Sequence, residues 1–276
     1  MKLSICNELF GAWPLEKVFS YVSRLGYHGV EIAPFTLTED VRSLGPRERR
    51  RLRELAESHG LEIVGLHWLL VKPEGLHILG PSRETINATL EYMRALIDFS
   101  ADLGGKVLVF GSPRQRNVPP GMSREEAWRR ALDFFSNVAE YAEERGQIVA
   151  IEPLARHLTN FINTVDEAVK LVEEVGSPGL RLILDVYSMT DEGRPYGEII
   201  RRGGRYLVHF HANDTNKLGP GFGDADYIEI LNALREVGYQ GFLSVEVFDT
   251  SPGAERIASE SIENLKKFGR MVGLEF

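Results

Sequence analysis

The chain has 276 residues, of which 43% are hydrophobic, and a formal net charge of −8. This length suits one large domain or two small ones, and the acidic balance argues against a broad basic surface for nucleic acid or anionic lipid. A single cysteine, Cys6, excludes an internal disulfide framework and a cysteine zinc cluster. No signal-peptide core and no apolar run of the ~18 residues that cross a bilayer occurs, so we expect a soluble, cytoplasmic protein with no nucleic-acid or membrane partner.

Short apolar segments and amphipathic segments alternate along the chain. The apolar segments predict strands at residues 2–6, 29–33, 61–68, 106–110, 149–153, 182–185, 207–211 and 243–247. The amphipathic segments predict helices at residues 14–25, 46–59, 83–103, 123–145, 165–175, 196–202, 227–237 and 254–271. Proline opens the first two helices, Ser123 with Glu126 fits a capping box, and Thr164 is a candidate N-cap.

Eight strands that alternate with eight helices predict a parallel sheet covered by helices. Eight repeats in 276 residues favour closure into a (β/α)8 TIM barrel, and we expect one domain over residues 1–276 because no linker or low-complexity tract divides the chain. An open, doubly wound sheet is the main alternative. It is disfavoured because a barrel brings the ends of four consecutive strands to one point more readily than an open sheet does.

Four consecutive predicted strands each place one metal-binding side chain near their end, namely Glu152, Asp185, His211 and Glu246. These residues are 33, 26 and 35 positions apart, which is one strand plus one crossover helix each time. Taken singly, Glu152 could form a salt bridge, Asp185 could cap a helix and His211 could be a satisfied core histidine. A shared divalent cation explains all four together, because acidic residues are rarely buried unless paired or bound to metal. Three carboxylates and one imidazole suit Mn²⁺, Co²⁺ or Mg²⁺ better than a thiolate-preferring ion.

The motifs Ile-Glu-Pro at 151–153, Leu-Asp at 184–185, Phe-His-Ala-Asn-Asp at 210–214 and Val-Glu-Val at 245–247 occur in this order. Together they resemble the sugar phosphate isomerase/epimerase superfamily of xylose isomerase-like barrels, and within it the ketose 3-epimerases. The resemblance spans essentially the whole chain, including Gly-Val-Glu at 29–31 and Gly-Leu-His at 65–67. It implies that Glu152, Asp185, His211 and Glu246 bind one divalent metal and that Glu152 and Glu246 also act as an acid/base pair. Mn²⁺ is the expected ion, with Co²⁺, Mg²⁺ or Zn²⁺ as alternatives.

These residue types suit the movement of a proton beside a carbonyl. Such a reaction needs a base, an acid and stabilisation of an enediolate, and two carboxylates flanking a metal ion provide all three. We therefore predict a metal-dependent isomerase or epimerase whose partner is a small keto-sugar or related polyol-ketone, and homo-oligomerisation stays open. An inosose dehydratase-like lyase and a non-catalytic sugar-binding barrel are the alternatives. An endonuclease-IV-type nuclease is disfavoured, because it needs further His and acidic ligands for several zinc ions and the chain is acidic.

The residues that would hold substrate differ from the ketose 3-epimerase pattern. Those enzymes carry Glu, His and Arg where this sequence has Leu158, Ser188 and Lys217. The differences predict a substrate other than a free ketohexose, such as one with an anionic end facing Lys217. Arg114 and Arg116, in the loop at 111–121, are further candidates for contacting an anionic group. The side chains that we expect to contact substrate are Glu31, His67, Arg156, Asn163 and Lys217.

Overall fold

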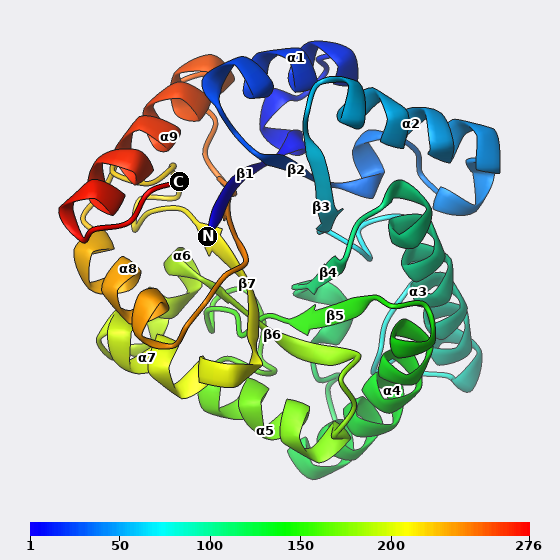
Figure 1. Ribbon diagram of the computed structural model, residues 1–276. Coiled ribbons are helices and arrows are strands. Elements are labelled where there is room, and N and C mark those ends of the chain that lie inside the picture. Colours follow the sequence, from blue (N-terminus) through cyan, green and yellow to red (C-terminus); the bar gives the residue numbers. More distant parts are fainter.

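A computed structural model describes all 276 residues of the chain. Eight parallel strands close into a barrel in sequence order, and β8 returns to β1 through pairs such as Val245 with Ile5 (Figure 1). The predicted (β/α)8 barrel is therefore confirmed and the open sheet is excluded. The strands are β1 (Lys2–Cys6), β2 (Gly29–Ile32), β3 (Glu62–Leu66), β4 (Val107–Phe110), β5 (Ile148–Ile151), β6 (Leu180–Asp185), β7 (Leu207–Ala212) and β8 (Phe242–Val245).

Helices form a ring around the outside of the barrel (Figure 1). They are α1 (Leu15–Leu25), α2 (Pro46–Ser58), α3 (Arg83–Leu103), α4 (Arg124–Glu144), α5 (Val165–Val175), α6 (Val186–Met189), α7 (Tyr196–Gly203), α8 (Tyr227–Glu236) and α9 (Ala254–Met271). All eight predicted helices are present within a residue or two of their predicted ends. The short helix α6 was not predicted. It exists because the Asp185 carboxylate accepts the Ser188 backbone N–H at 2.7 Å and so caps a single turn.

Side-chain caps fix the beginnings of the helices that the sequence marked most clearly. Thr164 accepts the backbone N–H of Glu167 at 3.2 Å, as predicted for the N-cap of α5. The predicted capping box of α4 is half formed. Ser123 accepts the N–H of Glu126 at 3.1 Å, but the Glu126 carboxylate pairs with Arg130 one turn further along.

The interior of the barrel has an apolar side and a polar side. A core of 67 buried apolar residues fills the space around the barrel, while Val109, Ala150 and Ile183 form a separate small cluster inside β4, β5 and β6. Val109, Ala150 and Ile183 lie two positions before Gly111, Glu152 and Asp185, and strand side chains alternate between faces. The remaining strands instead bury polar side chains, namely Ser4, Glu31, His209, His211 and Ser244.

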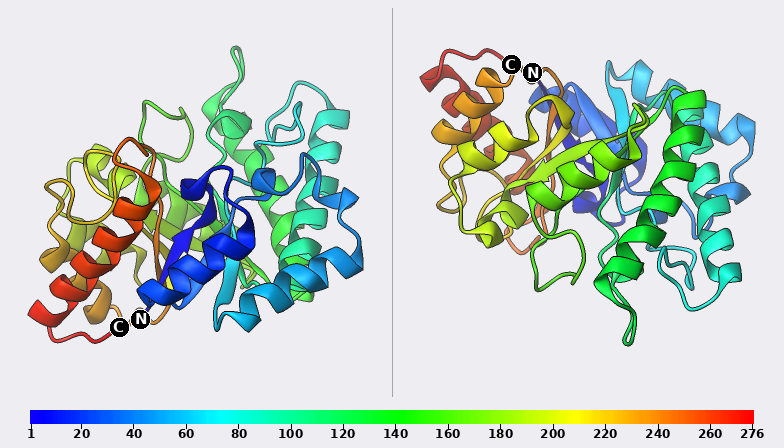
Figure 2. Two further views of the ribbon diagram at one scale, coloured as in Figure 1. Left: turned by 90° about the horizontal axis from the view of Figure 1, so that it is seen from above. Right: turned by 90° about the horizontal axis from the view of Figure 1, so that it is seen from below.

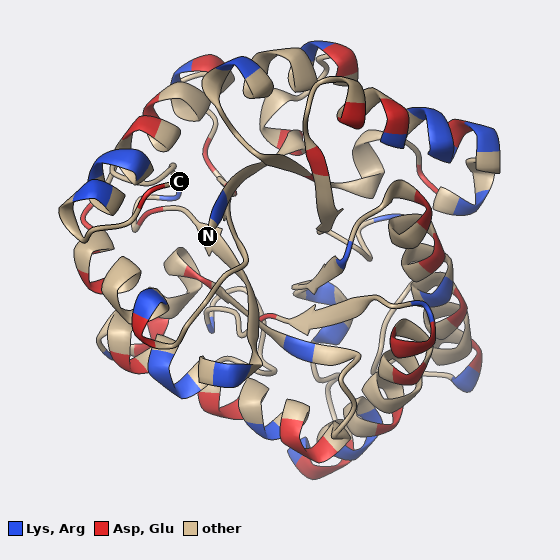
Figure 3. Cartoon of the chain, viewed as in Figure 1, with Lys and Arg blue, Asp and Glu red and all other residues tan.

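The two ends of the barrel differ. The chain termini lie side by side at the end where the strands begin, and the longer loops extend from the opposite end, where the strands finish (Figure 2). Lysine, arginine, aspartate and glutamate side chains are concentrated on the outer faces of the helices (Figure 3). None of the helices is both long and apolar enough to span a membrane. The carboxyl ends of the strands are where barrels of this kind build their active sites.

Candidate active site

The four residues predicted to form one cluster lie together at the carboxyl ends of β5 to β8. One ligand atom from each of Glu152, Asp185, His211 and Glu246 lies within 4.8 Å of the others, and all four side chains are buried. Asp185 and His211 are paired residues on the neighbouring strands β6 and β7. Glu152 and Glu246 directly follow the last residues of β5 and β8. Three carboxylates and one imidazole in this arrangement could hold a divalent cation.

Neighbouring groups fix the direction of these carboxylates. Asp185 accepts the Ser188 N–H through one oxygen and the side-chain amide of Asn213 through the other. Asn213 in turn accepts the backbone N–H of Tyr187 at 2.8 Å, which ties β7 to the loop after β6. Gly111 leaves room for Glu152, since a Cβ at this position would lie 2.5 Å from the Glu152 Oε2. The carboxylates are therefore held by hydrogen bonds and by available space.

The cluster carries more negative charge than its surroundings neutralise. Burial raises the pKa of Glu152 to about 8, and repulsion from Asp185 and Glu246 adds to that effect. Burial, followed by repulsion from Glu246, raises the pKa of Asp185 to about 6. Both shifts have the sign expected of carboxylates crowded together in a low-dielectric site. A divalent cation in the cluster would reverse them.

His211 lies between two carboxylates. Its Nδ1 is 2.9 Å from Glu246 Oε2, and its Nε2 is 3.2 Å from Glu31 Oε1. Burial acts to lower the pKa of His211, but Glu246 and Glu31 together raise it well above its ordinary value. Nδ1 makes no hydrogen bond of acceptable geometry although it is buried. Once Nδ1 releases its proton, its lone pair and the Glu246 oxygen 2.9 Å away can bind one cation, so the residues present fit a metal ion.

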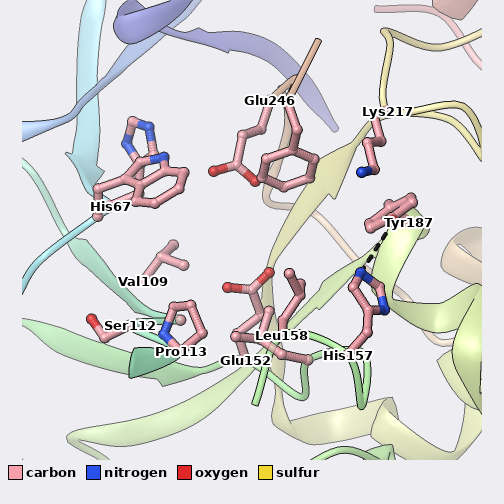
Figure 4. Close-up of a pocket in the computed structure, with 14 residues that line it drawn as sticks. His67, Val109, Ser112, Pro113, Glu152, His157, Leu158, Tyr187, Lys217 and Glu246 are labelled. Atoms are coloured by element: carbon pink, nitrogen blue, oxygen red, sulfur yellow. Dashed lines mark hydrogen bonds between the residues drawn. The ribbon is translucent and has the colours of Figure 1, made fainter. Parts of the chain in front are cut away.

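A pocket opens above the cluster. The carboxylates of Glu152 and Glu246 point toward each other across it (Figure 4). His67 lines the side of the pocket near Glu246, and its Nε2 is 2.7 Å from the Glu8 carboxylate. Apolar side chains form much of the remaining wall, namely Trp68, Val109, Pro113, Leu154, Leu158 and Phe248.

The opposite side of the pocket carries its only lysine or arginine. Lys217 lies with its Nζ 5.6 Å from the centre of the Tyr187 ring, and the Tyr187 hydroxyl is 3.2 Å from His157 Nε2 (Figure 4). The Lys217 backbone carbonyl accepts the N–H groups of Phe248 and Asp249, at 2.9 and 3.1 Å. These bonds join the loop after β7 to the loop after β8. The ammonium group can therefore meet an anionic or hydroxyl-bearing end of a ligand.

The pocket wall contains unusual backbone conformations. Four non-glycine residues of the chain have φ in the left-handed region, and Trp68, Ser112 and Lys217 among them line the pocket, with φ of 53°, 40° and 70°. Such conformations cost on the order of 1–3 kcal/mol each and persist where surrounding contacts determine them. They indicate that tertiary contacts, rather than local backbone preference, determine the conformation of the loops around the pocket.

A fully buried arginine supports Glu152 from below. Arg116 donates to the backbone carbonyls of Glu152 and Ile162, at 2.7 and 3.2 Å, and its side chain has no exposed surface. Burial lowers its pKa to about 10, against the attraction of Glu152 and Glu167. Arg116 was a candidate for contacting an anionic ligand from the sequence. Its guanidinium instead connects the end of β5 to the following loop and places a positive charge near the cluster.

The structure separates the predicted substrate contacts into two groups. His67 and Lys217 line the pocket, and so does Leu158. Arg156 does not, because it is exposed and pairs with Asp191 at 2.7 Å. Asn163 also lies outside the pocket.

Two predicted contacts are corrected by their hydrogen bonds. The Asn163 side-chain amide donates to the carbonyls of Leu154 and Thr159 and so stabilises the loop after β5. Glu31 is 1% exposed, lies beneath the cluster and bonds to His209 and His211. Neither side chain reaches the pocket wall.

Several residues of the site were not predicted. Glu8 lies two residues after Cys6, the last residue of β1, so the strand-end criterion that selected the four cluster residues could have identified it as well. His209 lies two positions before His211, and strand periodicity alone places the two rings on the same face. Asp214, fully buried, accepts the N–H groups of Gly221 and Ala225 and shapes the loop that carries Lys217. Asp214 ends the Phe-His-Ala-Asn-Asp motif, but the motif does not indicate its role, since its partners come from the conformation of that loop.

The chain belongs to the xylose isomerase-like TIM barrel family, whose sequence model matches residues 19–268. It is 34% identical over 119 residues to a D-psicose 3-epimerase of Enterocloster bolteae, an alignment that covers 43% of this chain and 40% of that enzyme. The chain thus matches about two fifths of the length of such relatives. It is 24% identical over 268 residues to a fructoselysine 3-epimerase of Shigella flexneri, and that alignment covers 92% of each protein.

Solved structures share the same fold. A D-psicose 3-epimerase with D-tagatose from Clostridium cellulolyticum H10 superposes with a TM-score of 0.85 at 22% identity, over 97% of this chain and 99% of that one. The relatives that match the sequence are named as 3-epimerases of sugars or of a sugar derivative.

The buried arginine gives a prediction about stability. Replacing Arg116 with methionine removes two charge-assisted hydrogen bonds, and the Ile162 carbonyl keeps only the Leu154 N–H as a donor, so we expect the free energy of unfolding to fall by about 2–4 kcal/mol. Arg114→Met is the matched control, since Arg114 is an exposed neighbour, and it should change stability by less than ~0.5 kcal/mol. Urea denaturation measures both variants. Equal stability of the two would show that Arg116 has no supporting role.

Proposed function

We propose that the chain is a divalent-metal-dependent epimerase of a keto-sugar or related polyol-ketone, in which Glu152 and Glu246 are the acid/base pair. The observation that carries this proposal is that these two carboxylates face each other across the pocket while both belong to the cluster with Asp185 and His211. Relatives named as ketose 3-epimerases support the same reaction type.

Glu152, Asp185, His211 and Glu246 would hold the metal ion. Their donor set is three carboxylates and a neutral imidazole nitrogen, which suits Mn²⁺ first and Co²⁺, Mg²⁺ or Zn²⁺ as alternatives. When bound, the ion supplies a Lewis acid that stabilises an oxyanion developing on the substrate by several kcal/mol. The repulsion among the buried carboxylates supports a cation at this place.

The two glutamates divide the proton transfer. With substrate between them, one carboxylate removes the proton from the carbon beside the carbonyl, and the electron pair of the broken C–H bond forms the enediolate. The other glutamate, in its acid form, returns a proton to the opposite face of that carbon, which inverts its configuration. Each such group contributes on the order of 10²–10⁴-fold. A non-catalytic sugar-binding barrel would not need both carboxylates facing the pocket.

The walls of the pocket determine which substrate fits. Leu158 and Phe248 offer no hydrogen bond, so a free ketohexose would leave hydroxyl groups unpaired there. Lys217 and His157 provide the polar end of the same region. We propose that the preferred keto-sugar carries an anionic group that meets the Lys217 ammonium.

The metal site is tested by a His211→Ala variant. Loss of a ligand should weaken Mn²⁺ binding by at least ~100-fold, more than loss of an outer hydrogen-bond partner does. Protein purified without chelator and dialysed against Mn²⁺ is analysed for metal content. His157→Ala, which alters the pocket wall but not the cluster, should keep the metal content of the wild type. Full metal content in His211→Ala would refute the assignment of the four ligands.

The acid/base pair is tested by Glu246→Gln and Glu152→Gln. An amide can remain a weak ligand but cannot accept the proton, so we expect epimerisation to fall by about 10²–10⁴-fold in each variant. In D₂O each variant should lose exchange at the epimer whose proton faces the missing carboxylate. Metal content is measured in the same samples, which separates loss of the base from loss of the ion. Wild-type exchange with both epimers in Glu246→Gln would place the base elsewhere.

Substrate preference is tested by comparing kcat/KM for psicose, fructose and tagatose with kcat/KM for their phosphates and for sugar acids. A charge-assisted hydrogen bond contributes about 1.5–3 kcal/mol, so the anionic compounds should be preferred by about 10–150-fold in the wild type. That preference should disappear in Lys217→Met. A free ketohexose used with kcat/KM of ~10⁴ M⁻¹s⁻¹ or above as the best substrate would contradict the proposed role of Lys217.

A further inference from the structure

Glu31 lies under the cluster and contacts two imidazole rings from the opposite side of the barrel. Its Oε2 is 2.8 Å from His209 Nε2, and its two oxygens are 3.2 and 3.3 Å from His211 Nε2. All three side chains are essentially buried, at 1% exposure or less. The strand pairing between β2 and β3 shifts register between Val30 and Glu31, so Glu31 occupies an irregular position in its strand.

These contacts determine where the hydrogen atoms of the two rings lie. An ionised carboxylate can only accept hydrogen bonds, so both Nε2 atoms must carry hydrogen and donate to Glu31. Both carboxylate oxygens of Glu31 lie within hydrogen-bond distance of an Nε2 atom, so the geometry of the three side chains supports this arrangement. His211 then uses Nε2 for Glu31 and leaves Nδ1 for the cluster, 2.9 Å from Glu246.

His209 gives this arrangement its rigidity. It binds the Glu31 Oε2 at the shortest distance of the set and makes no contact with the cluster through its other nitrogen, which is buried without a partner. A carboxylate held by His209 cannot rotate freely away from His211. His67 does not hold Glu31 in this way, because its Nδ1 is 3.7 Å from Glu31 Oε1 and forms no hydrogen bond.

We propose that Glu31 is a positioning residue that holds His211 as the tautomer with hydrogen on Nε2, so that Nδ1 is the nitrogen directed at the metal ion. The proposal rests on the proposed function, since it assumes a metal ion in the cluster. Carboxylates that accept the second N–H of a metal-bound histidine fix the ring and raise its basicity. Glu31 does so without lining the pocket, so its effect on the reaction passes through His211.

The first test measures Mn²⁺ affinity of Glu31→Gln by equilibrium dialysis. A neutral amide accepts hydrogen bonds more weakly than a carboxylate, and its NH₂ group would replace one of the two oxygens that face the Nε2–H groups. We expect the dissociation constant for Mn²⁺ to rise by about 10–100-fold. Glu192→Gln is the matched control, because the Glu192 side chain is 2% exposed and caps the Val165 N–H away from the cluster. It should bind Mn²⁺ like the wild type.

Wild-type affinity in a folded Glu31→Gln variant would overturn the proposal and leave the proposed function intact. Absence of Mn²⁺ binding by the wild-type chain would overturn the proposed function, and this proposal with it. Circular dichroism verifies that the variant is folded.

The second test needs no substitution at Glu31. Nitrogen-15 NMR of histidine-labelled wild-type protein loaded with diamagnetic Zn²⁺ reports which ring nitrogen of each histidine carries hydrogen. We expect His211 to show a proton on Nε2 and none on Nδ1, with the signal assigned by its disappearance in His211→Gln. Hydrogen on Nδ1 of His211, with Nε2 bound to the ion, would overturn the proposal even if Glu31→Gln fails to fold.

Discussion

The burial of four carboxylates inside one barrel is the constraint on which the rest of the site depends. Glu31, Glu152, Asp185 and Glu246 are each at most 5% exposed, and removing an ion from water costs several kcal/mol even after the protein relaxes. The fold meets this cost with fixed dipoles and charges: the Asn213 amide, the Ser188 N–H, two imidazoles and the Arg116 guanidinium. None of these neutralises the cluster fully. The proposed cation would neutralise the negative charge that these protein groups leave in the cluster.

The division of the barrel interior follows from the same constraint. On the side of β4 to β6, small and branched apolar side chains lie directly under Glu152 and Asp185, so water is excluded from below and charges there interact strongly. On the other side, Glu31 and the histidines form a hydrogen-bonded layer. The apolar side lowers the local dielectric constant around the cluster, and the polar side holds the His211 ring in place. A purely apolar floor would support the carboxylates but could not fix the ring of His211.

The sequence predicted the barrel and the four-residue cluster because both depend on repetition. Each of β5 to β8 repeats an apolar run followed by one ligand-type side chain, and parallel strands carry equivalent positions to the same end of the barrel. The Asp185 alternative, a helix cap, was also correct, since the carboxylate caps α6 while facing the cluster. Arg156 and Asn163 do not line the pocket, and their directions could not be predicted because they depend on loop conformation. Glu31 was expected at the pocket because the sequence identifies its strand. The sequence does not show how far below the end of the strand its side chain lies.

The hydrogen bonds from the Phe248 and Asp249 N–H groups to the Lys217 carbonyl bear on how ligand specificity can evolve in this family. They tie the loops after β7 and β8 together, although Phe248 lies 31 positions after Lys217 in the chain. A substitution that reshapes one loop must move the other, so its effect on ligand choice depends on what the second loop already carries. New specificities in such a barrel would then arise through paired changes in which neither step alone is advantageous, and exchange of one loop between relatives should transfer ligand choice less well than exchange of both.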